Sequence, residues 1–502
     1  MDASIFANLW LGLQTAGSFI NLFYCLTGVM LGTAIGVLPG LGPVATIAML
    51  LPITFGLPPV SSLIMLAGIF YGAQYGGSTT AILINLPGES SSIVTALDGH
   101  EMAKQGRAGK ALATAAWASF FAGTVTTILI ALFSPPLAEV ALKFGPAEYF
   151  SLMVLGLVAS VVLAHGSLMH ALGMIVFGLL LGIVGTDVNS GVARYSFDLP
   201  ELIDGINFVV VAMGVFGLGE IISNLQHETE RSLMVKKVTG LMLDRDDFKA
   251  IAAPVLRGTL LGSILGILPG GGAMLSSFAA YALEKKVSKN SANFGKGAIE
   301  GVASPEAANN AGAQTSFIPL LTLGIPSNAL MALMIGALMI QGIQPGPQIM
   351  VEQPELVWGV IASMWTGNLM LLVINLPLVG VWVSLLKVPY RLLFPAILLF
   401  CCIGAFGINN SVVDVWLMLG CAVVGYFFIK IKVETAPLLL GLVLGPQLEE
   451  NLRRAMLLSG GDATVFFTRP ISAVLLLAVA VILLVMMSPM VMKKRQEIVE
   501  AE

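Results

Sequence analysis

Small polar residues gather beside proline and glycine at a few places in this chain, where their types and spacing suit the binding of small ions. One cluster, Gly77-Ser78-Thr79-Thr80, leads to Asn85-Leu86-Pro87-Gly88. Proline removes a backbone donor and glycine permits non-helical dihedrals, so such a segment interrupts a helix. The interruption leaves unpaired N–H groups, which favour an anion, and carbonyl oxygens, which suit Na⁺ or another hard cation. The pattern predicts an ion site without lysine or arginine.

A second set of breaks repeats the first. Residues 32–42 read GTAIGVLPGLG and residues 262–272 read GSILGILPGGG, a constant 230 positions later. The later polar cluster, Gln314-Thr315-Ser316, leads to Ile325-Pro326-Ser327-Asn328, with a spacing that differs by three residues from that of the first half. An internal repeat of this kind indicates two related halves.

We predict that both sets of breaks contribute to one site. The predicted substrate-binding residues are Gly40, Gly42, Ser78, Thr79, Thr80, Asn85, Pro87, Gly88, Gly270, Gly271, Gly272, Thr315, Ser316, Pro326, Ser327 and Asn328. The candidate cation ligands are Thr79, Glu89, Thr315 and Asn328. Close helix packing is the alternative role for such residues. We favour ligand binding for the Pro-Gly positions and the hydroxyls, and packing for the four glycines that precede the breaks, Gly32, Gly36, Gly262 and Gly266.

The acidic residues near the breaks have different expected roles. Glu89 follows Pro87-Gly88 and suits either a cation ligand or an interfacial residue at a helix start. Glu306, in the run ASPEAANN, is expected to cap a helix start. Glu220 and Asp414 lie near the ends of apolar segments, where an interfacial position is expected.

Composition shows what kind of protein must position these residues. Of the 502 residues, 57% are hydrophobic and only 11% are charged. So few charges cannot cover the surface of a soluble protein of this size. The composition therefore excludes a soluble enzyme, a disordered protein and a nucleic-acid binder, which needs a basic surface. The predicted fold is an all-α polytopic membrane protein with about 10–14 membrane segments, including broken helices and re-entrant hairpins.

The basic residues predict the orientation. Lysine and arginine are absent before Lys104, whereas ten of the 25 lie between Arg231 and Lys296. The positive-inside rule then places the loops at 98–110, 226–250 and 284–300 in the cytoplasm, together with the carboxy-terminal tail. The last two loops bracket residues 251–283, whose two short apolar arms, 252–268 and 271–283, predict a hairpin.

The two copies of the repeat differ in their relation to this charge. The first copy lies in a region without positive charge and the second begins at the basic side, so the halves are predicted to be inverted-topology repeats. The predicted parts are residues 1–225 (first half, with breaks at 39–42 and 85–89 and a hydroxyl cluster at 77–80), 226–250 (charged cytoplasmic linker), 251–450 (second half, with breaks at 269–272 and 325–328 and a cluster at 312–316) and 451–502 (final loop, terminal membrane helix and cytoplasmic tail).

Motifs for nucleotide binding and for catalysis are missing from the sequence. It contains no G-x-x-x-x-G-K-[ST], no H-E-x-x-H, no CxxC pair and no serine elbow. We therefore expect no enzyme, no nucleotide or nucleic-acid partner, no transition metal and no cofactor. If the chain transports a solute, an ion gradient of Na⁺ or H⁺ must drive it.

Seven runs of the sequence share the pattern of one family. They are GVLPGLGP (36–43), YGAQYGGSTTAILINLPGE (71–89), LDGHEMAKQGRAGKAL (97–112), LPGGGA (268–273), SPEAANNAGA (304–313), LTLGIPSNAL (321–330) and QGIQPGP (341–347). With them, the chain resembles the large membrane subunit of the tripartite tricarboxylate transporters, the TctA family, from about residue 18 to its end. It departs from the usual pattern at Ser327-Asn328 and at Gln314-Thr315-Ser316, which would alter substrate choice or ion binding.

The resemblance implies a multi-pass permease of the bacterial inner membrane with a cytoplasmic carboxy terminus. The implied partners, besides the lipid bilayer, are a small four-helix membrane subunit and a periplasmic solute-binding protein. The binding protein would deliver a di- or tricarboxylate such as citrate for uptake coupled to Na⁺ or H⁺. Two alternatives remain: a single-component secondary carboxylate or ion antiporter and, more remotely, a membrane-embedded enzyme.

Overall fold

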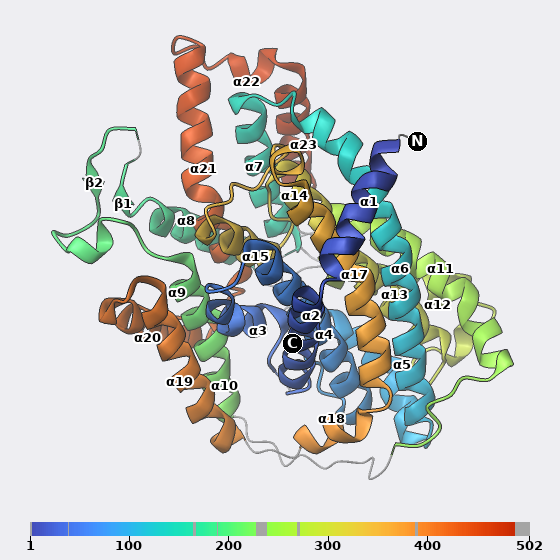
Figure 1. Cartoon of the computed structure of the whole chain (residues 1–502). Coiled ribbons are helices and arrows are strands. Elements are labelled where there is room, and N and C mark those ends of the chain that lie inside the picture. The colour runs from blue at the N-terminus through green and yellow to red at the C-terminus, as the bar shows by residue number, and fades with distance from the viewer. Residues whose placement is uncertain are drawn as a thin grey trace.

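The computed structural model describes residues 3–38, 40–163, 167–187, 189–226, 238–268, 272–386 and 390–486. Across these ranges the chain is almost entirely helical, and its one sheet is a short antiparallel hairpin (Figure 1). The predicted all-α membrane fold is confirmed. Gly185 pairs with Arg194 and Thr186 with Ala193 in the hairpin.

The helices follow the apolar segments of the sequence. The elements up to residue 226 are α1 Ala3–Ala16, α2 Phe19–Gly36, α3 Pro43–Leu50, η1 Leu51–Thr54, α4 Pro59–Ile84, η2 Ser90–Ser92, α5 Ile93–Lys104, α6 Ala108–Ala141, α7 Pro146–Leu163, α8 Leu168–Gly182, β1 Gly185–Thr186, β2 Ala193–Arg194, η3 Pro200–Leu202, α9 Phe208–Ala212, the π-helical η4 Met213–Leu218 and α10 Gly219–Gln226. The later elements are α11 Arg245–Ile267, α12 Gly272–Val287, η5 Ser291–Asn293, α13 Glu300–Thr315, α14 Phe317–Leu323, α15 Ala329–Ile340, α16 Ile349–Glu352, α17 Pro354–Asn375, α18 Val379–Leu385, α19 Tyr390–Asn409, α20 Val412–Lys430, α21 Ala436–Leu458, α22 Val465–Thr468 and α23 Pro470–Met486.

Six helical stretches in the described part are long and apolar enough to cross a membrane by length and composition. They are α2, α6, Phe208–Leu225, α11, α17 and α20. Six shorter apolar stretches accompany them, at Pro43–Thr54, Pro146–Val161, Leu168–Gly182, Ala329–Ile340, Phe394–Asn409 and Pro470–Met486. The predicted range of membrane segments is therefore reached only when short, broken helices are included.

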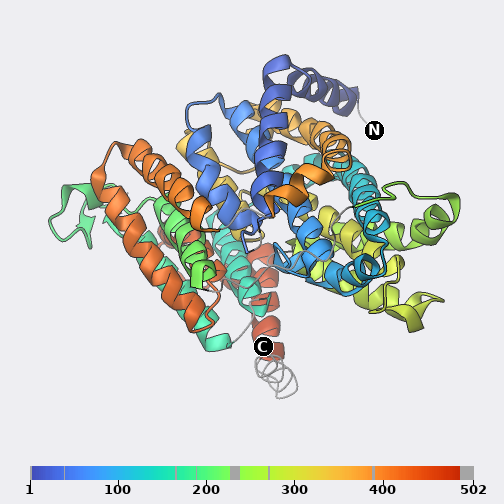
Figure 2. The same cartoon turned by 90° about the horizontal axis from the view of Figure 1, so that it is seen from below.

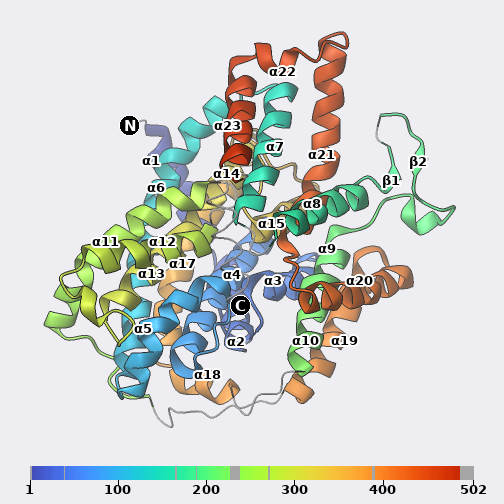
Figure 3. The same ribbon diagram turned by 180° about the vertical axis from the view of Figure 1, so that it is seen from behind.

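The helices form two groups, with α2, α3, α4 and α15 between them (Figures 1 and 2). One group contains α5, α6, α11, α12, α13 and α17, and Figure 3 shows α11, α12 and α13 side by side. In the other group α8 packs against α21, α7 against α23, and α20 against η4. Apolar side chains on α4, α15 and α17 fill the core between the groups, among them Ile69, Met331 and Ile361.

Glycines bring α2 against α4, backbone to backbone. A Cβ atom on Gly32 would lie 2.2 Å from the carbonyl oxygen of Ile69, and one on Gly36 would lie 2.3 Å from that of Ala73. Real Cβ atoms do not approach backbone this closely, so only glycine fits at these crossings. The packing role predicted for Gly32 and Gly36 is confirmed.

The second half repeats this contact between α11 and α13. A Cβ atom on Gly262 would lie 2.5 Å from the Ala308 carbonyl oxygen, and one on Gly266 would lie 2.4 Å from that of Gly312. The packing role predicted for these two glycines is confirmed as well. Helix α2 therefore runs parallel to α4 in the first half, and α11 runs parallel to α13 in the second.

The two helix pairs run in opposite directions. Gln74 of α4 contacts Asn309 of α13, whereas Ser78, one turn later on α4, contacts Glu306, about one turn earlier on α13. Helices α4 and α13 are therefore antiparallel, which is the geometry expected of inverted-topology repeats. The boundaries given above for the halves stay a prediction.

The predicted hairpin consists of α11 and α12. Arg257 of α11 forms a bidentate ion pair with Glu284 of α12 at 2.8 and 2.6 Å, so the two helices return toward the same end. Helix α11 is longer than the arm predicted at 252–268, because the Asp244 side chain begins it with a capping box that includes Asp247. The tip at 269–271, with its Pro-Gly break, lies outside the described residues.

Parts of the three loops predicted to be cytoplasmic lie together at one end, which we call the basic end. Lys110 contacts Asp244 at 3.0 Å and Asp247 at 2.8 Å, and Arg107 donates to the carbonyl oxygen of Gly297. These contacts join residues 98–110 to both other loops, as the positive-inside rule requires of loops on one side.

The carboxylate of Asp98 is expected to hold the basic end together. It is fully buried, and one oxygen accepts the N–H groups of Gly295, Gly297 and Ala298 while the other accepts the Tyr281 hydroxyl. Asp98→Ala leaves these donors unpaired and is expected to cost about 3 kcal/mol or more of unfolding free energy. Thermal unfolding of the purified protein measures this. The exposed Asp246→Ala is the control and should change little; equal melting temperatures for the two variants would contradict this role.

Candidate functional site

A polar stripe lies on the middle of α4, where an apolar face would be expected. Tyr71, Gln74, Tyr75 and Ser78 recur every three or four residues, so they share one face of the helix. Gln74 and Ser78 are buried and contact α13. Polar side chains at such depth need partners and commonly mark functional sites in membrane proteins.

A matching stripe lies on α13. Glu306, Asn309 and Asn310 share one face of this helix and are all buried, Glu306 with 3% of its surface exposed. The prediction that Glu306 caps a helix start is wrong, because α13 already begins at Glu300 and continues through Pro305. Small alanine and glycine residues around these side chains let the neighbouring helices approach the stripe closely.

Glu306 is the centre of the contacts between the stripes. Ser78 donates a hydrogen bond of 2.8 Å to its Oε1, and Thr95, on α5, donates one of 2.6 Å to the same atom. Glu89 lies at the other side of Asn309, which donates to Glu89 Oε1 at 3.1 Å and accepts from Gln74 Nε2 at 3.0 Å. We call Gln74, Ser78, Glu89, Thr95, Glu306 and Asn309 the polar seam.

The two carboxylates of the seam have only neutral partners. Within the described residues, no ion pair of a lysine or arginine includes Glu89 or Glu306. Glu306 is buried and Glu89 is partly buried, and two negative charges so placed without a positive one are unfavourable. A bound cation or proton would neutralise them.

The predicted hydroxyls of the first half take different roles. Ser78 lies in the polar seam. Thr80 donates to the carbonyl oxygen of Val37 at 2.8 Å and so connects α4 to the end of α2. Thr79 donates to the carbonyl oxygen of Tyr75 in its own helix, at 3.1 Å. Of these three, only Ser78 joins the two halves.

The two breaks of the first half, at 39–42 and 85–89, bring their predicted glycines together beside α4. A Cβ atom on Gly42 would lie 3.5 Å from the Gly88 carbonyl oxygen, while Gly40 lies against Asn224, whose amide donates to the Gly40 carbonyl oxygen. Asn85 ends α4 in the left-handed conformation, at φ 56°, and its side chain is exposed. Pro87 is half-buried in the turn that follows.

In the second half, the predicted polar residues near the breaks contact one another directly. Asn328 donates to the Ser316 hydroxyl at 3.3 Å and accepts the Met331 N–H, so it caps α15. Ser327 donates to the carbonyl oxygen of Ser316 at 3.5 Å, and a Cβ atom on Gly272 would lie 3.1 Å from the Asn328 amide nitrogen. Pro326 is buried between Ile325 and Ser327. Thr315 instead donates to Ala311 in its own helix, and Gly270 and Gly271 lie outside the described residues.

The four candidate cation ligands are divided between the two halves, and their role in one site stays a prediction. Thr79 and Glu89 lie at the first break, Thr315 and Asn328 at the second, and no hydrogen bond of the described residues joins the pairs. Glu89 precedes the short helix η2, and its side chain accepts a hydrogen bond from Asn309. Both roles considered for it stay predictions.

Sequence reasoning missed Gln74, Thr95, Glu306 and Asn309 as members of the site. The available signal was helical spacing: Gln74 lies one turn before Ser78, and Glu306, Asn309 and Asn310 fall on one helix face. The Pro-Gly breaks predict site residues at the ends of helices, whereas these four residues do not lie at a Pro-Gly break.

A pocket of about 530 Å³ opens at the end opposite the basic end. It is lined by the ends of α6 and α8, by the middle of α21 and by the segment Gln344–Gln348. Its wall includes Gly324, which ends α14 in the left-handed conformation and packs against the Pro345 carbonyl oxygen. The pocket therefore reaches the residues directly before the break at 325–328.

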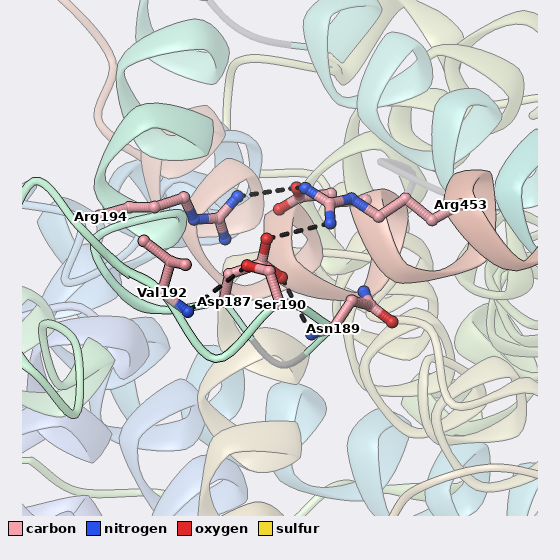
Figure 4. A network of polar contacts seen from close by, with 7 residues as sticks. Asp187, Asn189, Ser190, Val192, Arg194 and Arg453 are labelled. Carbon is pink, nitrogen blue, oxygen red and sulfur yellow. Dashed lines mark hydrogen bonds and ion pairs between the residues drawn. The ribbon is translucent and has the colours of Figure 1, made fainter.

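A chain of ion pairs ties the β-hairpin to α21 at the rim of this pocket (Figure 4). Asp187 contacts Arg453 at 3.0 Å, Arg453 contacts Glu449 at 2.6 Å, and Glu449 contacts Arg194 at 2.8 Å. Hydrogen bonds from the Asn189 N–H, Ser190 and Arg453 lower the pKa of Asp187 to about 2. Since the folded pKa lies below the unfolded value of about 3.9, the contribution of Asp187 is complete above that value and is lost as the pH falls toward 2.

Arg453→Met is expected to loosen the hairpin at neutral pH, because it removes the ion pairs to Asp187 and Glu449. A spin label on Val192→Cys, at an exposed position of the hairpin, reports this as increased mobility. The label on the otherwise unchanged protein should keep the same mobility from pH 7 to pH 4. Equal label mobility before and after the Arg453→Met substitution would show that the ion pairs do not hold the hairpin.

Comparisons with known proteins are consistent with this architecture. Residues 22–440 match the Tripartite tricarboxylate transporter TctA family. Among similar proteins, the "Uncharacterized 52.8 kDa protein in TAR-I ttuC′ 3′region" of Agrobacterium vitis is 59% identical over 494 residues, 98% of each chain. The "Uncharacterized protein in TAR-II ttuC′ 3′region" of the same organism is 58% identical over 237 residues, which are 47% of this chain and 98% of the relative. No solved structure matches.

Proposed function

Because this chain belongs to the tripartite tricarboxylate transporter TctA family, we propose that it is the permease of a three-component system that takes up organic carboxylates. The family assignment makes it a membrane transporter component, and the matched residues include both breaks of each half. The proposed partners are a small four-helix membrane subunit and a periplasmic solute-binding protein. The proposed location is the bacterial inner membrane, with the basic end and the carboxy terminus in the cytoplasm.

One observation supports coupled transport more than any other: the polar seam lies where two antiparallel helices of the two halves meet. Secondary transporters built from inverted repeats bind their substrates and coupling ions at such a place. The seam supplies carboxylate, amide and hydroxyl groups from α4, α5 and α13. We infer that a cation, Na⁺ or H⁺, neutralises the seam during each transport cycle.

The proposed substrate is a di- or tricarboxylate, with citrate as one candidate. At the second break, Ser316, Ser327 and Asn328 present hydroxyl and amide groups next to the start of α15. Helix starts and hydroxyl donors suit an anion, and no lysine or arginine in the described part of this break competes for it. The pocket at the opposite end from the basic end would receive the substrate from the binding protein.

Uptake by purified components tests this function. The chain and the small membrane subunit are reconstituted in proteoliposomes, and uptake of labelled citrate and of smaller dicarboxylates is measured with and without the solute-binding protein. We expect uptake only when the binding protein is present. A denatured binding protein serves as the control for added protein.

The same experiment distinguishes the alternatives. Robust uptake without the binding protein would contradict the tripartite function and favour a single-component carboxylate or ion antiporter. A membrane-embedded enzyme would instead convert the labelled compound chemically, which chromatography of the liposome contents detects. Recovery of unchanged substrate inside the liposomes is the result expected of a permease.

A further inference from the structure

We propose that the polar seam contains a Na⁺ site between α4 and α13, with a Glu306 carboxylate oxygen, Gln74 Oε1 and Asn310 Oδ1 among its ligands. The inference deepens the proposed function and rests on it only for the role of the ion in uptake. Binding of the ion is a separate property, which can be measured without any substrate.

The orientation of the Gln74 amide follows from the carboxylate of Glu89. An ionised carboxylate only accepts hydrogen bonds, so the Asn309 atom that faces Glu89 must be its amide nitrogen. The Asn309 oxygen then faces Gln74, which must contribute its own amide nitrogen to that contact. Gln74 Oε1 is thereby left over, and this buried atom has no hydrogen-bond partner in the described part of the chain.

A second unpartnered oxygen lies on the opposing helix. Asn310 follows Glu306 by one helical turn on the same face of α13, and its buried Oδ1 also has no partner among the described residues. Gln74 and Asn310 are both more than nine-tenths buried. Together with Glu306, which contacts Ser78 one turn after Gln74, they place oxygen acceptors on both sides of the interface between the halves.

The chemistry of these atoms selects a cation. A bound carboxylate or phosphate would need several donors. Of the unpartnered buried atoms on the two stripes, the Gln74 and Asn310 oxygens only accept, and the Tyr71 and Tyr75 hydroxyls can accept as well as donate. A proton on Glu306 would neutralise one charge but would leave both amide oxygens unpaired. A hard monovalent cation satisfies the amide oxygens and the carboxylate together, since such ions prefer oxygen ligands.

A cation at this place would connect the two halves directly. Its ligands come from α4 and from α13, which belong to opposite copies of the repeat. An ion that binds both helices favours the arrangement in which they are close, and its release removes that preference. Substrate uptake would then depend on Na⁺ through the relative position of the halves.

Na⁺-dependent thermal stability of the purified chain, without substrate or binding protein, tests the site. We expect NaCl, but not choline chloride at the same ionic strength, to raise the melting temperature in a saturable way. Glu306→Gln and Gln74→Met should each shift the half-saturating Na⁺ concentration upward by about tenfold or more, as expected for loss of a ligand. The control is Glu220→Gln, which changes a carboxylate of α10 outside the seam and should keep the response of the unchanged protein.

Three outcomes would overturn the site: no Na⁺ response in the unchanged protein, the same response after Glu306→Gln and Gln74→Met, or the same loss after Glu220→Gln. Gln74→Met keeps both carboxylates, so it still tests the site if the Glu306→Gln variant does not fold. Carboxylate uptake that persists in any of these cases leaves the permease function standing. Absence of uptake with an intact Na⁺ response contradicts the function and leaves the site standing.

Discussion

Glu306→Gln is expected to reduce cation-driven carboxylate uptake by about 100-fold or more while the protein still folds. The variant removes the negative charge at the centre of the polar seam, and loss of one member of a buried charged interaction costs about 3 kcal/mol or more. The glutamine oxygen can still accept the hydrogen bonds that Ser78 and Thr95 now donate to Glu306 Oε1. Uptake and yield of folded protein, measured on the same preparation, separate the two effects.

The matched control for this prediction is Glu220→Gln. Glu220 also lies in an apolar helical stretch, Phe208–Leu225, but it belongs to α10 and not to the seam. Uptake by this variant should stay within about twofold of that by the unchanged protein. Equal uptake by both glutamine variants would remove Glu306 from the transport cycle.

Gly262→Leu is expected to prevent folding. A Cβ atom at this position would lie 2.5 Å from the carbonyl oxygen and 2.7 Å from the Cα atom of Ala308, which are backbone atoms that cannot turn away. Separation of α11 from α13 would also disrupt the α13 side of the seam. We expect a loss of about 4 kcal/mol or more, at the upper end of the range for single substitutions. Size-exclusion chromatography of the detergent extract should show little or no monodisperse protein.

Gly173→Leu is the matched control. This glycine also lies within an apolar helix, α8, but a Cβ atom there meets nothing within 4 Å. The larger side chain should face lipid, so the variant should elute like the unchanged protein. Similar elution profiles for both leucine variants would mean that α11 and α13 do not pack as described.

The repeat made much of the fold predictable. The spacing of Gly32, Gly36, Gly262 and Gly266 is visible in the sequence because each of these four glycines lies against the backbone of a neighbouring helix. The same spacing indicated close packing, and the contacts of Gly32 with Ile69 and Gly262 with Ala308 confirm it. Apolar length likewise predicted the membrane helices, although the start of α11 was set by the cap at Asp244, a signal that lies outside the apolar run.

The site was less predictable, because its contacts join residues far apart in the chain. Ser78 could be singled out from its neighbours Thr79 and Thr80 only by its contact with Glu306, on the other half. Glu306 looked like a helix cap because Pro305 precedes it, yet α13 passes through that proline. The ion pairs from Asp187 and Arg194 to α21 have no local signal at all.

We propose above all that an ion gradient drives carboxylate uptake through this permease. The most direct measurement is accumulation of labelled carboxylate in proteoliposomes with the complete three-component system, under an imposed inward gradient of Na⁺ or, in parallel, of protons. We expect at least one gradient to drive the internal concentration above the external one, and dissipation of the gradient to return the two to equality. Internal concentrations that never exceed the external one under either gradient would contradict it.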